Sequence, residues 1–135
     1  MFCYCAQARR LARVLTARYD MALAPADLTA AQFETLSLLQ AVGTSTGRVL
    51  AERLLLSKTT LSRNVKPLID AGLISARQGD EDARQTLYVL ATKGRQRLAK
   101  ALPLWQAAHN ASLEMLGASA APSQHALQQM TQALR

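Results

Sequence analysis

The stretch from Ser57 to Gly72, SKTTLSRNVKPLIDAG, carries the residues best suited to bind another molecule. At the 3.6-residue period of an α-helix, Leu61, Val65, Leu68 and Ile69 share one side, which predicts that this side faces a core. Hydroxyl and basic side chains share another side, without an acidic residue, and such a face suits phosphate oxygens and base edges. The candidate contact residues on it are Lys58, Thr59, Ser62, Arg63 and Lys66.

Both ends of this expected helix are marked in the sequence. Ser57 can accept a hydrogen bond from a free first-turn amide, and Gly72 can adopt the left-handed conformation that closes a helix. Pro67 lies inside the pattern and predicts a bend. A shorter helix is expected over 48–56, with Val49, Leu50 and Leu54 inward. Two helices joined so tightly indicate a helix-turn-helix, whose second helix enters the major groove of DNA.

The elements before and after this pair form the rest of the predicted fold. Helices are expected over 2–22 and from Thr29 to about residue 41, the second opened by capping-box spacing of Thr29 and Gln32, with a loop over 43–47. Strand-like runs over 73–78 and 85–90 indicate a hairpin, which directly after such a helix is a wing. Long helical patterns then cover 92–116 and 119–134, the first with Leu98, Leu102, Trp105 and Leu113 inward. The expected fold is mainly α with a small β-hairpin wing.

Composition limits the kind of protein and its partners. A chain of 135 residues, half of them apolar, is expected to form a single domain over 1–135 with its own core. The net charge of +7 favours a polyanionic partner, either nucleic acid or an anionic membrane surface. Apolar runs are too short to span a bilayer, and the N-terminus does not resemble a secretory signal, so we expect a cytoplasmic location without membrane contact.

The outer helices are too long and apolar to bury themselves on so small a body. We therefore expect residues 1–22 and 92–135 to form a homodimer around a DNA-binding unit over 29–90. A two-fold dimer places two recognition helices roughly 34 Å apart and reads a near-palindrome in double-stranded DNA. The candidate residues for the dimer interface or for a pocket beside it are Tyr4, Leu11, Leu15, Tyr19, Trp105, Leu127 and Met130.

This order of elements resembles the MarR family of winged helix-turn-helix transcriptional regulators over nearly the whole chain. The most specific segments are TTLSRNVKPLIDAGLI at 59–74 and the spacing of Asp82, Arg84 and Leu90. The resemblance implies that Ser57 to Lys66 supply the major-groove contacts, which adds Ser57 and Thr60 to the candidates. It also implies that Arg84 enters the minor groove and that Asp82 holds it; Arg77 is a further expected DNA contact of the wing. The sequence departs from the family at two positions. Leu55 occupies a turn position that often holds glycine, and Ala91 follows Leu90, so Thr92 is expected to cap the long helix.

Cys3 and Cys5 allow two interpretations. As small apolar residues they would pack near the dimer axis; as thiols they would sense oxidants or a soft ion. Side chains two residues apart on a helix point about 160° away from each other, so one helix cannot clamp an ion between them. His109 and His125 have no ligand partner at metal-site spacing, and we expect neither a metal nor a cofactor.

The sequence has no phosphate-binding glycine loop and no nucleophile beside a base, which argues against an enzyme. The function that we expect is a sequence-specific, homodimeric repressor, released by a small molecule, thiol oxidation or a soft ion. Two alternatives remain at this stage. One is an architectural DNA-binding protein of low sequence specificity, and the other is a cysteine-based redox or metal sensor.

Overall fold

A computed structural model describes residues 2–135; Met1, the first residue of the predicted domain and of its N-terminal segment, lies outside the described residues. Helices make up most of the described chain, as predicted, and a small antiparallel sheet completes it. The helices are α1 (Tyr4–Leu23), η1 (Ala24–Ala26), α2 (Ala30–Val42), α3 (Gly47–Leu54), α4 (Lys58–Asp70), α5 (Thr92–Leu116), η2 (Gly117–Ser119) and α6 (Ala120–Ala133). The strands are β1 (Ser45–Thr46), β2 (Ile74–Gln78) and β3 (Thr86–Leu90).

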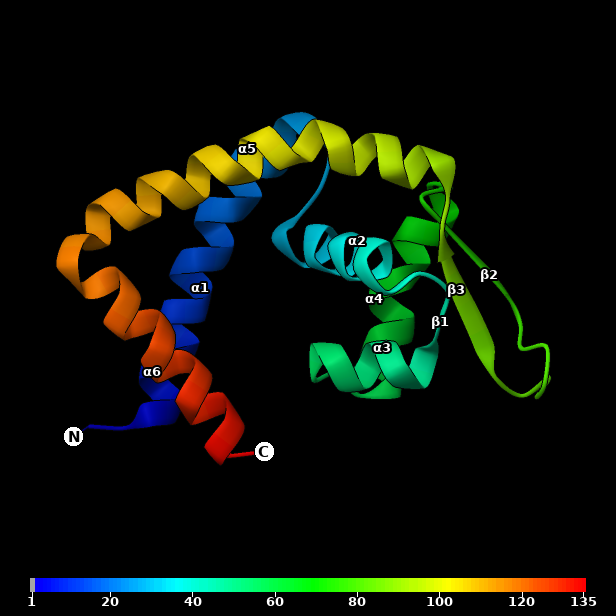
Figure 1. Cartoon of the computed structure of the whole chain (residues 1–135), viewed down its shortest axis with the longest axis horizontal. Coiled ribbons are helices and arrows are strands. Elements are labelled where there is room, and N and C mark those ends of the chain that lie inside the picture. The colour runs from blue at the N-terminus through cyan, green and yellow to red at the C-terminus, as the bar shows by residue number, and fades with distance from the viewer. Residues whose placement is uncertain (1) are drawn as a thin grey trace.

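The long helix α5 joins two parts of the molecule (Figure 1). One part is compact and consists of α2, α3, α4 and the sheet; we call it the body. The other part is elongated and consists of α1, α6 and the half of α5 that follows Pro103; we call it the arm. None of the helices within residues 2–135 is long and apolar enough to cross a membrane.

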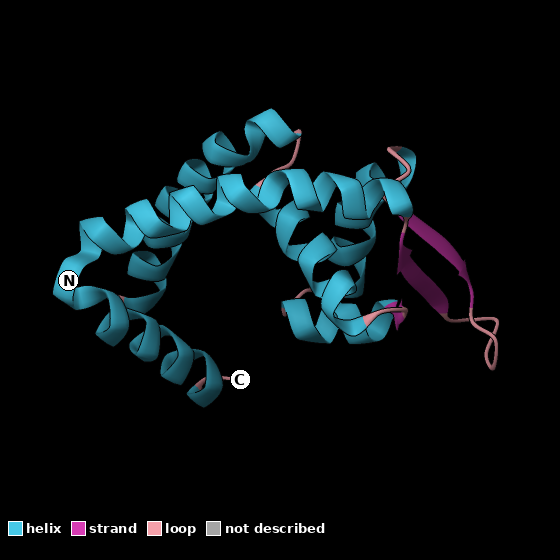
Figure 2. Cartoon of the chain, turned by 45° about the horizontal axis from the view of Figure 1, so that its top comes forward, coloured by secondary structure: helices cyan, strands magenta, loops and turns pink. Residues whose placement is uncertain are grey.

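The wing is the hairpin of β2 and β3, which projects from the body beyond the helices (Figure 2). The two strands are antiparallel, with Ile74 opposite Leu90 at the base and Gln78 opposite Thr86 near the tip. The predicted hairpin is therefore confirmed, with both strands starting one residue later than expected.

The sheet has a third strand that the sequence did not indicate. Within the predicted loop over 43–47, Ser45 and Thr46 form β1 and pair antiparallel with Tyr88 and Leu87 of β3. Two residues are too few to show the alternating pattern of a strand, and the partner strand lies far away along the chain. The pairing ties the start of α3 to the wing.

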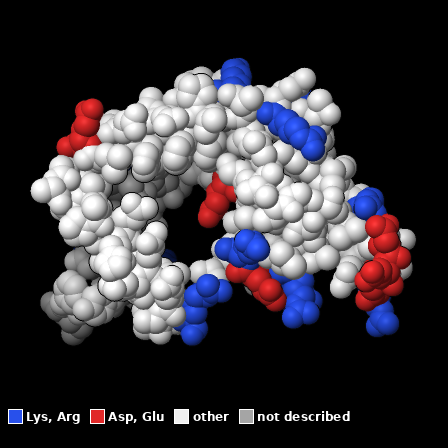
Figure 3. Space-filling view, in the orientation of Figure 1, with Lys and Arg blue, Asp and Glu red and all other residues white. Residues whose placement is uncertain are grey.

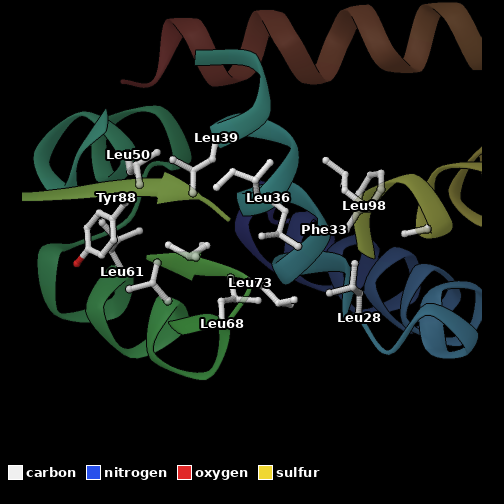
Figure 4. Close-up of a cluster of buried hydrophobic side chains, with 14 of the residues drawn as sticks. Leu28, Phe33, Leu36, Leu39, Leu50, Leu61, Leu68, Leu73, Tyr88 and Leu98 are labelled. Carbon is white, nitrogen blue, oxygen red and sulfur yellow. The ribbon is translucent and has the colours of Figure 1, made fainter. Parts of the chain in front are cut away.

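Leucine side chains from α2, α3, α4 and β3, with other apolar side chains, form one core (Figure 4). On α4, Leu61, Val65 and Leu68 are buried and Ile69 is partly buried, so the predicted apolar side of this helix is confirmed. The buried residues that meet them include Leu36, Leu39, Leu50, Leu73 and Tyr88. This core sets which side of α4 remains available to solvent.

The start of α2 has the predicted capping box. Thr29 Oγ1 accepts a hydrogen bond from the Gln32 amide at 3.2 Å, and Gln32 Oε1 accepts one from the Thr29 amide at 3.0 Å. Leu28, just before the cap, is buried with Phe33 in the core. The helix ends at Val42, one residue beyond the expected end.

Three residues predicted to point inward are exposed in the single chain: Val49 by 38%, Leu102 by 50% and Leu113 by 39%. The buried residues of these helices include small ones instead, Ala51 on α3 and Gly94 and Ala101 on α5. Close approach of a helix to its neighbour selects small side chains, and an apolar periodicity does not reveal this.

The two departures from the family pattern had different outcomes. Leu55 is the C-cap of α3 and adopts a left-handed conformation, with φ 55° and ψ 41°, in the place where glycine is usual. Thr92, in contrast, does not cap α5. Ala91 is the N-cap and provides no side-chain hydrogen bond, so the expected role of Thr92 was wrong.

Candidate nucleic-acid interface

The first turns of α4 present the predicted polar face to solvent. Ser57 is the N-cap, and its Oγ accepts a hydrogen bond from the Thr60 amide at 3.1 Å and donates one to Thr60 Oγ1 at 2.9 Å. These bonds fix the orientation of the first turn. The other candidate residues on the helix are all exposed: Lys58, Thr59, Ser62, Arg63 and Lys66.

The end of α4 is closed as the sequence predicted. Gly72 has φ +73°, its amide donates to the Ile69 carbonyl at 2.9 Å, and the Leu73 amide donates to the Leu68 carbonyl at 2.9 Å. This pair of bonds is the Schellman motif. It turns the chain directly from α4 into β2, and so it sets the position of the wing relative to α4.

The basic residues on α4 differ in how they are held. Lys66 Nζ lies 2.9 Å from Asp70 Oδ2, one turn on, a pairing that the sequence analysis did not consider. Both side chains are exposed, and such a pair contributes at most about 1 kcal/mol, so Lys66 is readily released to a stronger anion. Among the described residues, no hydrogen bond or ion pair holds the guanidinium of Arg63. It therefore extends freely from the face of α4.

The wing has two arginine–aspartate contacts. Arg77 Nη1 lies 2.7 Å from Asp80 Oδ1. Asp82 Oδ1 accepts a hydrogen bond from the Arg84 backbone amide at 3.0 Å and lies 3.7 Å from Arg84 Nε, while the Arg84 side chain is 95% exposed. The longer distance is an ion pair rather than a hydrogen bond. Asp82 thus supports Arg84 mainly through its backbone.

A concave surface brings the α4 residues and the wing residues together. A cavity of about 400 Å³ is lined by Lys58 and Ser62 of α4, by Asp82 and Arg84 of the wing, and by Arg48 at the start of α3. In the space-filling view, basic side chains lie along the lower edge of the molecule from the body to the wing, with acidic ones among them (Figure 3). Lys58 and Ser62 of α4 and Arg84 of the wing therefore border a single cavity, whereas the predicted contacts Thr59, Arg63, Lys66 and Arg77 do not line it.

Sequence reasoning missed two residues of this surface. Arg48 in the first turn of α3 and Tyr88 of β3 both line the cavity. Burial raises the pKa of the Tyr88 phenol above its ordinary value of 10.0, so the phenol stays neutral and able to donate a hydrogen bond. The positive charge of Arg48 was the one sequence feature that could have indicated a DNA contact. Nothing in the strand pattern of the wing predicts that Tyr88 lines this cavity.

The predicted pocket and interface residues fall into two groups. Tyr19 and Trp105 line a second cavity, of about 290 Å³, where α1, α2 and α5 meet. The others, Tyr4, Leu11, Leu15, Leu127 and Met130, do not line it. They lie along α1 and α6 and are exposed or partly exposed in the single chain.

Cys3 and Cys5 are both exposed free thiols near the start of α1. Cys3 is the extended N-cap residue, with φ −135° and ψ 115°, and Cys5 is the second residue of the helix. The expectation that both lie on one helix was wrong, and the angle of about 160° that an ideal helix imposes does not apply to this pair. Within residues 2–135, no cluster of three or more His, Cys, Asp or Glu side chains could hold a metal ion.

Comparison with known proteins identifies the family. The MarR family model matches residues 26–85, which span the helix-turn-helix and the wing up to the start of β3. The transcriptional regulator MosR of M. tuberculosis, solved in complex with DNA, is 35% identical over 99% of this chain and 99% of its own, with a TM-score of 0.81. No curated protein matches the sequence significantly.

Two further structures share the fold. A mutant MarR from E. coli, complexed with operator DNA, is 22% identical over 93% of this chain and 91% of its own, with a TM-score of 0.83. PcaV from Streptomyces coelicolor, in complex with its natural ligand, is 22% identical over 96% and 92%, with a TM-score of 0.86. The 35% identity to MosR over the full length and the family match at residues 26–85 confirm the predicted fold and resemblance. The chain belongs to the MarR family of winged helix-turn-helix transcriptional regulators.

Proposed function

We propose that the protein is a homodimeric repressor that binds a near-palindromic operator in the cytoplasm and performs no catalytic step. The observation that carries this proposal is the concave surface between α4 and the wing, bordered by Lys58, Ser62 and Arg84. An exposed basic helix face beside a wing with two exposed arginines, Arg77 and Arg84, matches the shape and charge of duplex DNA. MosR, the 35% identical relative, was solved bound to DNA.

The DNA contacts follow from the positions of the side chains. The first turns of α4, from Ser57 to Lys66, enter the major groove, where Arg63 can donate two hydrogen bonds to one guanine. Arg84 enters the adjacent minor groove, and Arg77 and Arg48 contact the sugar–phosphate backbone. The hydroxyl groups of Thr59, Thr60 and Ser62 accept or donate, so they read shape and position more than a fixed base sequence.

The dimer forms through the arm. The dimerisation residues are 1–22 and 92–135, which include the arm and also the half of α5 before Pro103, and 29–90 form the DNA-binding unit. Large apolar side chains on these helices are left exposed by the single chain, and a two-fold partner would bury them. They are Tyr4, Leu11, Val14, Met21, Leu113, Met115, Leu116, Leu127 and Leu134.

Release from DNA occurs when an effector changes the angle between arm and body. The cavity between α1, α2 and α5 lies at this joint, which favours a small molecule as the effector. A ligand acts only to the extent that it prefers the non-binding form, and each 1.4 kcal/mol of preference is about tenfold in operator affinity. The exposed thiols of Cys3 and Cys5 support a second route, in which an oxidant acts on the start of α1.

A binding titration against the DNA just upstream of its own gene, with excess random DNA, tests the proposal. The protein is measured first reduced and then after treatment with a mild thiol oxidant, beside a variant carrying Cys3→Ser and Cys5→Ser. Tight binding that oxidation abolishes only in the native protein assigns the switch to the thiols. Tight binding in both states excludes the thiols as the switch and directs the search to a small molecule in the cavity.

The architectural alternative predicts a different result in the same titration. Such a protein would bind random DNA about as well as the upstream DNA, with an equally steep fall in affinity as salt rises. If random DNA competes fully at every salt concentration and for every candidate operator, the proposal of a sequence-specific repressor is wrong.

A further inference from the structure

The cavity at the joint of arm and body has aromatic walls. Tyr19 of α1, Phe33 of α2 and Trp105 of α5 line it, and the buried Leu23 forms its floor. Phe33 and Trp105 are stacked, with ring centroids 5.8 Å apart and an interplanar angle of 16°. His109 stacks on Trp105, at 4.9 Å and 7°. A column of parallel rings therefore holds the indole in a fixed orientation beside the cavity.

The charge around this cavity is negative, although the chain carries a net charge of +7. Glu34 lines the cavity, and none of its other lining residues is a lysine, an arginine or an aspartate. None of the five ion pairs found within residues 2–135 involves Glu34. The carboxylate of Asp20 bonds to the amide of Ala30 but lines a different cavity, so the exposed Glu34 is the acidic group of this one.

These two properties select one class of ligand. The face of an aromatic ring is negative and attracts a cation held within about 6 Å, most strongly when the cation is desolvated. A carboxylate ligand in the same place would face the ring electrons and Glu34 without a basic partner. It would lose hydration without a compensating interaction. Aromatic walls with one unpaired carboxylate are thus suited to a compact organic cation.

We propose that the effector of this regulator is an organic cation, an aromatic or alkyl amine or quaternary ammonium compound, bound in the cavity lined by Tyr19, Phe33 and Trp105, with Glu34 as its counter-ion. This inference rests on the proposed function, because it names the ligand class of the cavity to which release was assigned. The bound cation touches α1 and α5 of the arm and α2 of the body, so its binding energy depends on the angle between them.

Trp105 provides the measurement, because it is the only tryptophan of the chain and it lines the cavity. Quenching of its fluorescence is recorded with three probes that share a benzene ring: benzyltrimethylammonium, neutral benzyl alcohol and anionic benzoate. We expect the cation to bind about tenfold more tightly than benzoate, from the attraction of the rings and of Glu34.

Two variants separate charge from folding. Glu34→Gln keeps the size of the side chain and should weaken binding of the cation relative to benzoate, to a ratio several-fold lower. Glu114→Gln is the matched control, since Glu114 is exposed on α5 and does not line this cavity. It should leave the ratio unchanged.

Three results would overturn the inference. They are tighter binding of benzoate than of the cation, an unchanged ratio in Glu34→Gln, and the absence of quenching by all three probes. Operator binding is measured in the same samples without a probe. A protein that binds its operator and prefers benzoate retains the proposed function and loses only the ligand class, whereas a protein that binds no operator contradicts the proposed function itself.

Discussion

The carboxylate of Asp20, near the end of α1, accepts a hydrogen bond of 2.7 Å from the backbone amide of Ala30, the first residue of α2. Thr29 and Gln32 already form the capping box, so three side chains accept hydrogen bonds from amides at the start of α2, one of them from the arm. The bond is partly buried, and it joins the arm to the body at the beginning of the DNA-binding unit.

We expect Asp20→Ala to lower the free energy of unfolding by about 1 kcal/mol, the usual cost of losing a helix N-cap bond. Asp20→Asn keeps an acceptor oxygen and should lose less. Urea unfolding followed by circular dichroism measures both, with Asp70→Ala as the control because its ion pair is exposed. Equal stability of Asp20→Ala and the native protein would mean that this bond does not hold the joint in solution.

Arg63 on α4 tests base recognition. Arg63→Ala should weaken binding to the operator by about 1–3 kcal/mol per half-site, as expected for loss of a bidentate guanine contact, and binding to random DNA by much less. Fluorescence anisotropy with both duplexes at one salt concentration measures the difference. Lys100→Ala removes the same charge from an exposed site on α5 and serves as the control. Equal losses on the two duplexes would reduce Arg63 to a phosphate contact.

Arg84 at the wing should behave differently. Arg84→Ala is expected to lower affinity for operator and random DNA alike, with only a modest loss of sequence preference, and to reduce the salt slope of binding by about one. Arg84→Lys keeps the charge and should retain most of the affinity for random DNA. If the alanine variant binds as the native protein does, the wing does not enter the groove.

Gly94 on α5 lies against the base of the wing. A methyl group at this position would overlap the backbone carbonyl of Leu73 and contact Leu90. Because backbone cannot move aside as a flexible side chain does, we expect Gly94→Ala to lower the free energy of unfolding by about 1–3 kcal/mol. Gly47→Ala is the comparison, since its nearest neighbour is a side-chain carbon of Tyr88 at 3.3 Å. A stability loss no larger than that of Gly47→Ala would contradict the close contact.

Tyr88 makes stability depend on pH in the alkaline range. Burial raises the pKa of its phenol in the folded protein, so the contribution of the neutral phenol is complete below pH 10 and is lost as pH rises through the folded pKa. We expect the free energy of unfolding to fall above pH 10, and less steeply in Tyr88→Phe. Urea unfolding at a series of pH values compares the two; identical curves would contradict the prediction.

Local signals predicted the elements well. Thr29 with Gln32, Ser57 and Gly72 marked helix ends because capping is a short-range interaction that a sequence displays directly. Leu102 and Leu113 were wrongly predicted to point inward, because burial depends on which surface a helix meets and this is not a short-range property. An apolar stripe has the same period whether it meets the core of its own chain or the surface of a second copy, and only packing distinguishes the two.

The parts of the site that sequence reasoning missed depend on distant pairing. β1 exists because Ser45 and Thr46 meet β3, and Tyr88 reaches the nucleic-acid face because that strand carries it there. Glu34 was likewise one acidic residue among others until α1 and α5 placed aromatic rings beside it. Each of these features depends on contacts between segments that are distant in the sequence, and no local pattern predicts such contacts.

Gly94 near the start of α5 contacts Leu73 at the base of the wing, so a tilt of α5 moves the wing with it. The helix has 25 residues and is therefore roughly 38 Å long at 1.5 Å per residue. A tilt of about 5° along that length displaces one end by about 3 Å relative to the other. This is close to the rise of one base pair, about 3.4 Å. A change too small to alter any single contact in the arm can thus move the wing by about one base pair along the DNA.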